Sequence, residues 1–344
     1  MKALVKTAPG YNQMVLQEIE RPKPEKDQVL IKVAYTGICG TDVHGFKGEY
    51  DRLKTPLVLG HEFSGIVAEV GSEVTKVKIG DEVTSETTFA TCGICEPCQN
   101  KEYNLCLKRK GLGSQVNGSF AEYVLTREES VHLLNDKISL LAASVTEPIA
   151  CGVHASMEKT QVQAGDVVIV IGPGPIGLCL TQALKSLGAV VIVMGITQDV
   201  DRLKTAKELG ADYTIDTQAE DAVKIIQEIT GKGADYCFEC SGAAPAVKNT
   251  FDYLRQKGTL VQMGVFAQNE NLLDLNSIVQ REMNIVGSRS QKPSTWHLTL
   301  DLMEKGKIDA ERLITKIYPL EEWEKAFEDA MAGTQIKVVL QPNN

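Results

Sequence analysis

The feature that most constrains the fold is an alternation of apolar runs and helical patterns in the second half of the chain. Strands that alternate with helices are typical of βαβ units, which form a parallel sheet covered by helices on both faces. The apolar runs lie at 166–171, 190–194, 213–215, 234–239, 259–263 and 284–287, and the clearest helical patterns at 178–187 and 200–209.

The first half of the chain shows the period of β-structure instead. Apolar and polar residues alternate at 28–34, 62–70 and 121–125, and long helical patterns are rare before residue 138. Alternation with period two is typical of strands that bury one face. At about 150 residues per domain, 344 residues suggest two domains. We predict an α/β protein in which a doubly wound parallel sheet is joined to a β-rich domain.

Composition narrows the classes of partner. The chain has 36 Lys and Arg against 45 Asp and Glu, and its formal net charge is −9. This balance argues against nucleic acid and membranes as main partners. The longest uncharged stretch, 167–184, is interrupted by glycines and prolines, so a strand, turn and helix explain it better than a membrane span. Because no apolar leader follows Met1, we expect a cytoplasmic protein.

A glycine-rich turn follows the first apolar run of the second half. Residues 172–177 fit the pattern G-x-G-x-x-G between a predicted strand and a predicted helix. Glycines here let the backbone approach a pyrophosphate at the positive end of a helix. The alternative is a glycine-rich connector without a ligand. The predicted dinucleotide-binding residues are Gly172, Gly174, Pro175, Ile176 and Gly177.

The second apolar run ends without the acid that binds the ribose of NAD. That acid is expected about 20 residues after the glycine turn, but Gly195 stands at the end of the run and the next acid is Asp199. A 2′-phosphate would meet no carboxylate here, and Thr197 and Arg202 could bind it. The pattern favours NADP modestly over NAD, unless Arg202 is a solvated helix residue and Asp199 folds back to the ribose.

Four of the nine cysteines form a group. Cys92, Cys95, Cys98 and Cys106 lie within 15 residues, at spacings that suit one tetrahedral zinc ion. A site closed by four protein ligands has a structural role. An iron–sulfur centre and a zinc-ribbon nucleic-acid module are alternatives, and the acidic surroundings weaken the second. We predict a structural zinc lobe over about residues 90–107.

Three separated segments supply candidate ligands for a second metal. A cysteine, a histidine and a carboxylate form the kind of mixed set that catalytic zinc uses, with one position open for water or substrate. Taken singly, each residue has an ordinary explanation in the core or on the surface, so spacing alone leaves this metal open. The three segments contain Cys39, Thr41, Asp42 and His44, then His61 and Glu62, then Glu147.

The order and spacing of these motifs resemble the zinc-dependent medium-chain alcohol dehydrogenases over essentially the whole chain. Glu147-Pro148 resembles the polyol branch, which includes sorbitol and threonine dehydrogenases. The resemblance implies a Rossmann-type domain at 153–295 and a GroES-like catalytic domain at 1–152, completed by 296–344. It also implies hydride transfer between a nicotinamide cofactor and a polyol, or another small secondary alcohol or its ketone.

The same resemblance implies roles for the residues of the second metal site. Cys39 and His61 would bind a catalytic zinc ion, with Glu62 as a constant or alternating ligand. Glu147 would bind the ion directly or through water, and Asp42 would orient the His61 ring.

Proton transfer would begin at Thr41, which would accept the proton of the alcohol. The cofactor ribose and then His44 would pass this proton to solvent. Relatives are commonly dimers or tetramers, so we expect a homo-oligomer. A threonine- or butanediol-type dehydrogenase and a non-catalytic nucleotide-binding zinc protein are the alternatives.

Overall fold

The computed structural model describes residues 1–343, and the chain divides into two compact units. Unit 1 comprises residues 1–147 and 291–304 and the chain from 310 onward, whereas unit 2 comprises 148–290 and 305–309. No helix in the described residues combines the length and apolar character needed to cross a bilayer. All nine cysteines are free thiols.

Unit 2 is built on one parallel sheet of six strands in the order β13-β12-β11-β14-β15-β16. The doubly wound sheet predicted from the sequence is therefore confirmed. In such a sheet the strand order reverses beside the first strand, and ligands bind outside the carboxyl ends of the strands at that point. The strands are β11 (Val167–Ile171), β12 (Val190–Gly195), β13 (Tyr213–Asp216), β14 (Ala234–Glu239), β15 (Leu254–Gln262) and β16 (Asn284–Gly287).

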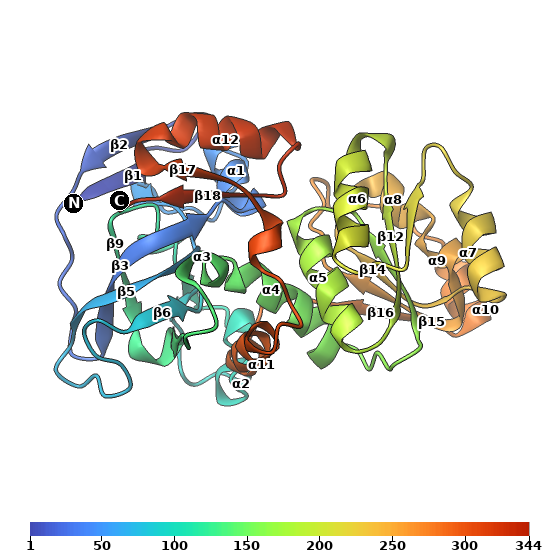
Figure 1. Ribbon diagram of the computed structural model, residues 1–344, viewed down its shortest axis with the longest axis horizontal. Coiled ribbons are helices and arrows are strands. Elements are labelled where there is room, and N and C mark those ends of the chain that lie inside the picture. The colour runs from blue at the N-terminus through green and yellow to red at the C-terminus, as the bar shows by residue number, and fades with distance from the viewer. Residues whose placement is uncertain (344) are drawn as a thin grey trace. The chain divides into compact units, whose positions relative to one another are not determined.

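Helices cover this sheet because its strands are apolar on both faces. In β11 four of the five residues are buried, and α5 and α6 pack against β11, β12 and β13 (Figure 1). The helices of unit 2 are α5 (Pro175–Ser186), α6 (Val200–Glu208), α7 (Ala222–Thr230), α8 (Ala244–Lys248), α9 (Thr250–Tyr253) and α10 (Leu275–Arg281).

Two elements of unit 2 start earlier than predicted. Helix α5 begins at Pro175 rather than residue 178, because a proline suits the first turn of a helix, where its missing N–H is not needed. Strand β15 begins at Leu254 rather than residue 259. Residues 255–258 are polar or glycine, so an apolar run does not mark the start of this strand. The register with β14 also shifts here, between Ala234 and Tyr236 of β14.

Unit 1 contains a seven-stranded sheet in the order β10-β6-β5-β3-β18-β17, with β9 also paired to β3. Smaller sheets join β2, β1 and β4, and β7 and β8. The strands are β1 (Lys2–Lys6), β2 (Met14–Glu18), β3 (Gln28–Gly37), β4 (Leu57–Val58), β5 (Glu62–Val70), β6 (Glu82–Ser85), β7 (Thr88–Ala90), β8 (Lys110–Gly111), β9 (Tyr123–Arg127), β10 (Val131–Leu133), β17 (Ile314–Pro319) and β18 (Lys337–Gln341).

The C-terminal segment completes the sheet of unit 1. Strand β18 lies between β3 and β17, and Val339 is paired with Gly37. Helix α12 packs on β18, and its Phe327 belongs to the same buried cluster as Phe46 and Phe120. The helices of unit 1 are α1 (Gly40–Lys47), α2 (Glu96–Gln99), α3 (Leu140–Ala143), α11 (Pro293–Glu304) and α12 (Trp323–Ala332), and α4 (Thr146–Val153) crosses the boundary between the units.

The units divide at slightly different residues from those expected. The divisions fall after Glu147 and Ser290, five residues before the expected ends at 152 and 295. Residues 305–309 belong to unit 2 although the sequence assigned them to the catalytic domain. Within unit 2, Asp309 N–H donates to Gln182 Oε1 (2.7 Å) and Gln182 Nε2 donates to the Asp309 carbonyl (3.3 Å).

Candidate active site

The pairing of β3 with β5 brings Cys39 and His61 together. Gly37, the last residue of β3, is paired with Glu62, the first residue of β5. Because the strands are antiparallel, the chain leaves β3 next to the point where it enters β5. One ligand atom each of Cys39, His61 and Glu62 lies within 4.8 Å of the others. Ligand atoms around one zinc ion are roughly 3.5 Å apart, so small side-chain shifts would let this group hold zinc.

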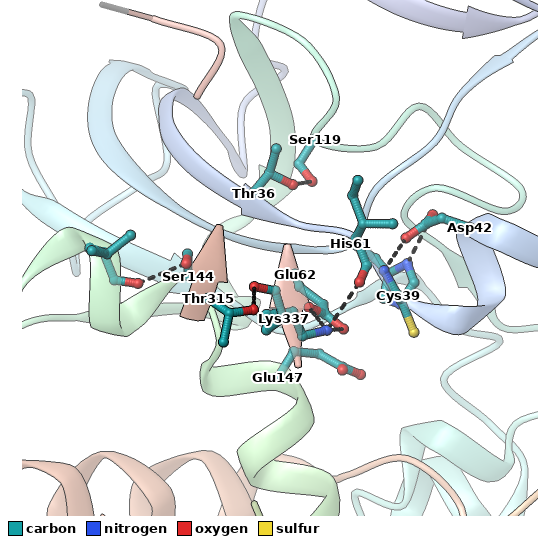
Figure 2. Close-up of polar contacts among 12 residues, drawn as sticks. Thr36, Cys39, Asp42, His61, Glu62, Ser119, Ser144, Glu147, Thr315 and Lys337 are labelled. Carbon is teal, nitrogen blue, oxygen red and sulfur yellow. Dashed lines mark hydrogen bonds and ion pairs between the residues drawn. The ribbon is translucent and has the colours of Figure 1, made fainter. Parts of the chain in front are cut away.

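Asp42 ties the segments of Cys39 and His61 to each other. Its Oδ2 accepts a hydrogen bond from the Cys39 N–H (2.9 Å), and its Oδ1 accepts one from the Gly60 N–H (3.1 Å). The His61 Nδ1 lies 3.8 Å from Asp42 Oδ1, which leaves Nε2 as the ring nitrogen for a metal (Figure 2). Burial opposes the charged ring, but Asp42 and Cys39 outweigh it and raise the pKa of His61 well above its usual value.

Glu62 forms a buried ion pair with Lys337. The Lys337 Nζ lies 2.8 Å from Glu62 Oε1 and 2.7 Å from Oε2 (Figure 2). Both side chains are almost fully buried, at 4% and 1% exposure. The carboxylate lies over Gly37, where a Cβ would come within 2.3 Å of Glu62 Oε2, so only glycine leaves room for it. The alternative that Glu62 is an ordinary surface residue is therefore wrong.

The second carboxylate of the site, Glu147, is buried at the start of α4. Gln291 Nε2 donates a hydrogen bond to Glu147 Oε1 (3.1 Å), and both residues lie in unit 1. Burial raises the pKa of Glu147, and the opposite charge on His61 is the largest effect that lowers it. Neither Gln291 nor Lys337 was predicted as a residue of this site. A lysine at the head of an apolar strand was the one available signal for Lys337, whereas Gln291 offered none.

The two residues expected to move the proton lie on α1. Thr41 is half-buried in the first turn of this helix, and His44 follows one turn later. The His44 side chain is 60% exposed, and its Nδ1 lies 2.8 Å from Glu49 Oε2. Residues three apart on a helix share a face, so the helix places both side chains on one side.

The four lobe cysteines converge as a tetrahedral zinc site requires. The Sγ atoms of Cys95 and Cys98 are 3.4 Å apart, those of Cys92 and Cys106 are 3.7 Å apart, and those of Cys92 and Cys98 are 3.9 Å apart. Zinc–sulfur bonds of 2.3 Å in a tetrahedron place the sulfurs about 3.8 Å apart. The donor set therefore fits a zinc ion closed on all sides.

Backbone N–H groups stabilise the thiolate form of one cysteine in this lobe. The N–H groups of Ile94 and Cys95 donate to the Cys92 sulfur and lower the pKa of Cys92 to about 6. A thiolate is the form that binds zinc. Cys92 therefore loses its proton more readily than an ordinary thiol, whereas at Cys95 the lowering effect of the Cys98 N–H is outweighed by burial and the neighbouring sulfurs, which raise the pKa of Cys95 to about 12.

The glycine turn of unit 2 has the geometry that a dinucleotide needs. Gly172 has φ +94°, and a Cβ on Gly177 would lie 2.0 Å from the Gly172 carbonyl oxygen, so both positions require glycine. A Cβ on Gly174 would meet nothing within 4 Å, which leaves its backbone open to a ligand. Pro175 and Ile176 begin α5, whose N-terminus carries the positive end of the helix dipole.

The end of β12 carries more negative charge than its sequence suggests. Thr197 donates a hydrogen bond to Asp216 Oδ2 (2.8 Å), and Arg202 lies 3.7 Å from Asp199 Oδ1. A Cβ on Gly195 would lie 3.2 Å from Asp199 Oδ2, so the Asp199 carboxylate folds back beside the strand end. Both side chains expected to bind a 2′-phosphate are thus already engaged by acids.

Family models match both units. Residues 25–136 match the alcohol dehydrogenase GroES-like domain, and residues 175–305 match the zinc-binding dehydrogenase domain. Together the matches cover well over half of the chain. The GroES-like and Rossmann-type assignments made from the sequence are thereby confirmed.

Two relatives align over nearly their whole length. The D-arabitol-phosphate dehydrogenase of Enterococcus avium is 53% identical over 344 residues, which cover 100% of this chain and 98% of the relative. The sorbitol dehydrogenase of Halalkalibacterium halodurans is 49% identical over 343 residues, with 99% of each chain covered.

Among solved structures, a zinc-binding dehydrogenase from Sinorhizobium meliloti 1021 bound to NADP superposes with a TM-score of 0.91. It is 32% identical, and the alignment covers 99% of each chain. A non-catalytic protein is therefore set aside. The chain belongs to the zinc-dependent medium-chain alcohol dehydrogenases, in their polyol branch, and is an oxidoreductase that uses zinc and a nicotinamide cofactor.

Proposed function

We propose that this enzyme oxidises a secondary hydroxyl group of a phosphorylated polyol to the ketone, or runs the reverse reaction. The observation that carries the polyol assignment is the acidic ligand set of unit 1, in which Cys39 and His61 are accompanied by the buried carboxylates Glu62 and Glu147. The phosphate is supported by the 53% identity to a D-arabitol-phosphate dehydrogenase, and the sorbitol dehydrogenase at 49% supports an unphosphorylated polyol as the competing substrate.

Cys39, His61 and one of the two carboxylates would hold the catalytic zinc ion. When bound, zinc supplies Lewis-acid stabilisation of the negative charge that develops on the alcohol oxygen. Thr41 would accept the proton of the substrate hydroxyl, because it lies two residues after Cys39 in the first turn of α1. His44, exposed on the next turn, would pass the proton to solvent.

In unit 2 the turn at Gly172, Gly174 and Gly177 would hold the pyrophosphate of the cofactor. We propose that NADP is preferred over NAD by a small factor. Gly195 supports NADP because no acid projects from the strand end itself, and Arg202 partly neutralises Asp199. The carboxylates of Asp199 and Asp216 keep the preference small.

A substrate panel tests this function. Purified enzyme is mixed with D-arabitol phosphate, D-arabitol, sorbitol, galactitol phosphate, L-threonine and 2,3-butanediol, each with NAD and with NADP, and the reduced nicotinamide is followed by absorbance. We expect the highest kcat/KM with a phosphorylated polyol. Preference for a free polyol would remove the phosphate from the proposal, and preference for threonine or butanediol would overturn it.

We also propose that the enzyme is a homo-oligomer that acts in the cytoplasm. Strand β16 is an edge of the sheet of unit 2, and apolar side chains are exposed on it and on the preceding segment: Ile285 is 46%, Val279 80%, Leu272 78% and Val265 92% exposed. Exposed apolar side chains beside an unpaired strand edge suit contact with a second copy of the chain. Nine free thiols suit a reducing compartment. Sedimentation of wild type and Val279→Asp tests the assembly, and a monomeric wild type would contradict it.

A further inference from the structure

A buried carboxylate without a counter-ion lies at the carboxyl edge of the sheet of unit 2. Glu239 is the last residue of β14, and its side chain is fully buried. Within residues 1–343, which the structure describes, no lysine, arginine or histidine forms an ion pair with it. Burying a charge is unfavourable unless other groups compensate it, so the surroundings of Glu239 decide what this charge can do.

Hydrogen bonds hold Glu239 as the anion. Its Oε1 accepts from the N–H groups of Ser241 (2.8 Å) and Gly242 (3.1 Å) and from the Ser241 hydroxyl. Its Oε2 accepts from the side-chain amide of Gln262, the last residue of β15 (2.8 Å). All of these partners are donors, and a carboxyl group that only accepts is ionised. Donors of this kind favour the charged form, so a fixed negative charge lies at the end of β14.

This charge lies beside the glycine turn. The loop that it organises, residues 240–242, lies against Gly172, where a Cβ would come within 2.9 Å of the Ser241 Cβ. The Cys240 N–H donates to the carbonyl of Ile171, the last residue of β11 (3.0 Å). Strands β11 and β14 are the pair at which the strand order reverses, and dinucleotides bind outside the carboxyl ends of the strands at that point.

The sheet of unit 2 has two halves, and each half binds one mononucleotide of a dinucleotide. Strands β11, β12 and β13 form the half with the glycine turn and the end of β12, where the adenosine ribose would lie. Strands β14, β15 and β16 form the other half, so the nicotinamide would lie on the side of Glu239. The nicotinamide ring is a cation when oxidised and neutral when reduced. The buried charge is therefore on the side of the cofactor whose own charge changes in the reaction.

We infer that the Glu239 carboxylate stabilises the oxidised, cationic nicotinamide relative to the reduced, neutral ring. This inference rests on the dinucleotide site proposed above. Opposite charges attract more strongly inside a protein than in bulk water, and the hydrogen bonds of Glu239 fix its carboxylate in place. Both redox forms carry the same pyrophosphate, so the charge acts on the difference between their affinities. It favours hydride transfer from the reduced cofactor to a ketone, since this direction forms the cationic ring.

Cofactor binding to the zinc-loaded, full-length enzyme tests this inference without turnover. Binding of NADPH is followed by its fluorescence, and NADP⁺ and 2′-phospho-ADP-ribose, which lacks the nicotinamide, are measured by competition. The variants are Glu239→Gln, which removes the charge at nearly constant shape, and Glu239→Asp, which keeps the charge but withdraws it from Gln262. The double variant Glu239→Gln/Gln262→Glu returns a negative charge to the same hydrogen bond from β15.

In Glu239→Gln we expect the affinity for NADP⁺ to fall about tenfold relative to that for NADPH, while binding of 2′-phospho-ADP-ribose changes little. This ratio corresponds to a rise of about 30 mV in the potential of the bound cofactor. Glu239→Asp weakens all three ligands alike and keeps the wild-type ratio, and the double variant restores this ratio. Equal weakening of all three ligands in Glu239→Gln would show that Glu239 only supports the loop, and this result or an unchanged ratio would overturn the inference.

The two variants that keep the charge decide the matter if Glu239→Gln does not fold. Both should retain the wild-type ratio of affinities for NADP⁺ and NADPH, and a ratio that falls in both as the hydrogen bonds change would overturn the inference. A wild-type enzyme that binds neither redox form would instead refute the dinucleotide site of the proposed function.

Discussion

The zinc lobe takes its four thiols from one stretch of 15 residues, whereas the catalytic site takes its groups from residues 39, 61, 62 and 147 and their partners from 291 and 337. The lobe sulfurs are arranged by local turns and by backbone N–H groups. The catalytic groups are arranged by the pairing of β3 with β5 and β18.

The geometry of the lobe therefore depends on one loop, whereas the geometry of the catalytic site depends on contacts between distant parts of unit 1. None of the four lobe cysteines lies in the paired strands β3, β5 and β18. The catalytic site depends on three strands that are distant in sequence, and its charges are balanced only when all are in place.

The largest effect is expected for Cys39→Ser. Loss of the thiolate should remove the catalytic zinc ion and lower kcat/KM by at least about 10³-fold, because a metal contributes several kcal/mol to charge stabilisation. Metal analysis should then find one zinc ion per chain, that of the lobe. A variant that keeps two zinc ions and its activity would show that Cys39 is not a ligand.

Cys95→Ser should remove the lobe zinc ion and leave the catalytic site intact. We expect loss of the lobe zinc ion and a fall of about 10 °C in the melting temperature, while kcat of the folded enzyme stays within a few-fold of wild type. Calorimetry and turnover at low temperature measure the two effects. Loss of turnover in a fully folded variant would contradict a purely structural lobe.

The lobe should also release zinc in mild acid. The pKa of Cys92 is lowered to about 6 from 9.0, so the stabilisation from its thiolate is complete above pH 9 and is lost as the pH falls through about 6. Chelator-driven zinc release from Cys39→Ser, which retains the lobe ion alone, should therefore accelerate below about pH 6. A release rate that does not change with pH between about 5 and 8 would contradict loss of the lobe zinc ion by protonation of its thiolates.

Proton transfer should be affected less strongly than metal binding. We expect Thr41→Ala to lower kcat by about 10²-fold and His44→Gln by about tenfold, the smaller value because water reaches the exposed His44. Thr41→Ser is the matched control and should retain most activity. Turnover close to wild type across the pH range in both Thr41→Ala and His44→Gln would rule out this relay.

The smallest effect is expected for the preference between NADP and NAD. Asp199→Ala should raise the ratio of kcat/KM with NADP to that with NAD by about fivefold, because one negative charge near the 2′-phosphate is removed. The exposed Asp201 provides the control, since Asp201→Ala removes the same charge from the first turn of α6. An equal change of this ratio in both variants would show that the Asp199 carboxylate does not act on the 2′-phosphate more strongly than Asp201 does.

Features encoded within one short segment could be predicted from the sequence. The four lobe cysteines and the glycine turn were found by spacing alone, and the alternation after residue 166 gave the parallel sheet, because each depends on neighbouring residues. The starts of α5 and β15 were missed because Pro175 and the polar start of β15 interrupt the apolar pattern.

Contacts between distant segments could not be predicted in the same way. Thr197 and Arg202 suggested a phosphate site, but Thr197 bonds Asp216, which a different strand places there. The partners of Glu62 and Glu147 come from residues 337 and 291, and neither position carries a motif. One sequence shows which groups are present, and the strand register decides which of them meet.

The place of β18 has a consequence for the synthesis of the protein. Lys337, which balances the buried Glu62, follows it by 275 residues and leaves the ribosome long after it. Until it does, β3 is paired with β5 and β9 but not with β18, and the Glu62 carboxylate lacks this counter-ion. A nascent or prematurely terminated chain can therefore fold its nucleotide-binding unit and its zinc lobe and still lack a competent catalytic centre. We expect C-terminal truncation, or a bulky fusion close to β18, to yield a well-expressed but inactive enzyme.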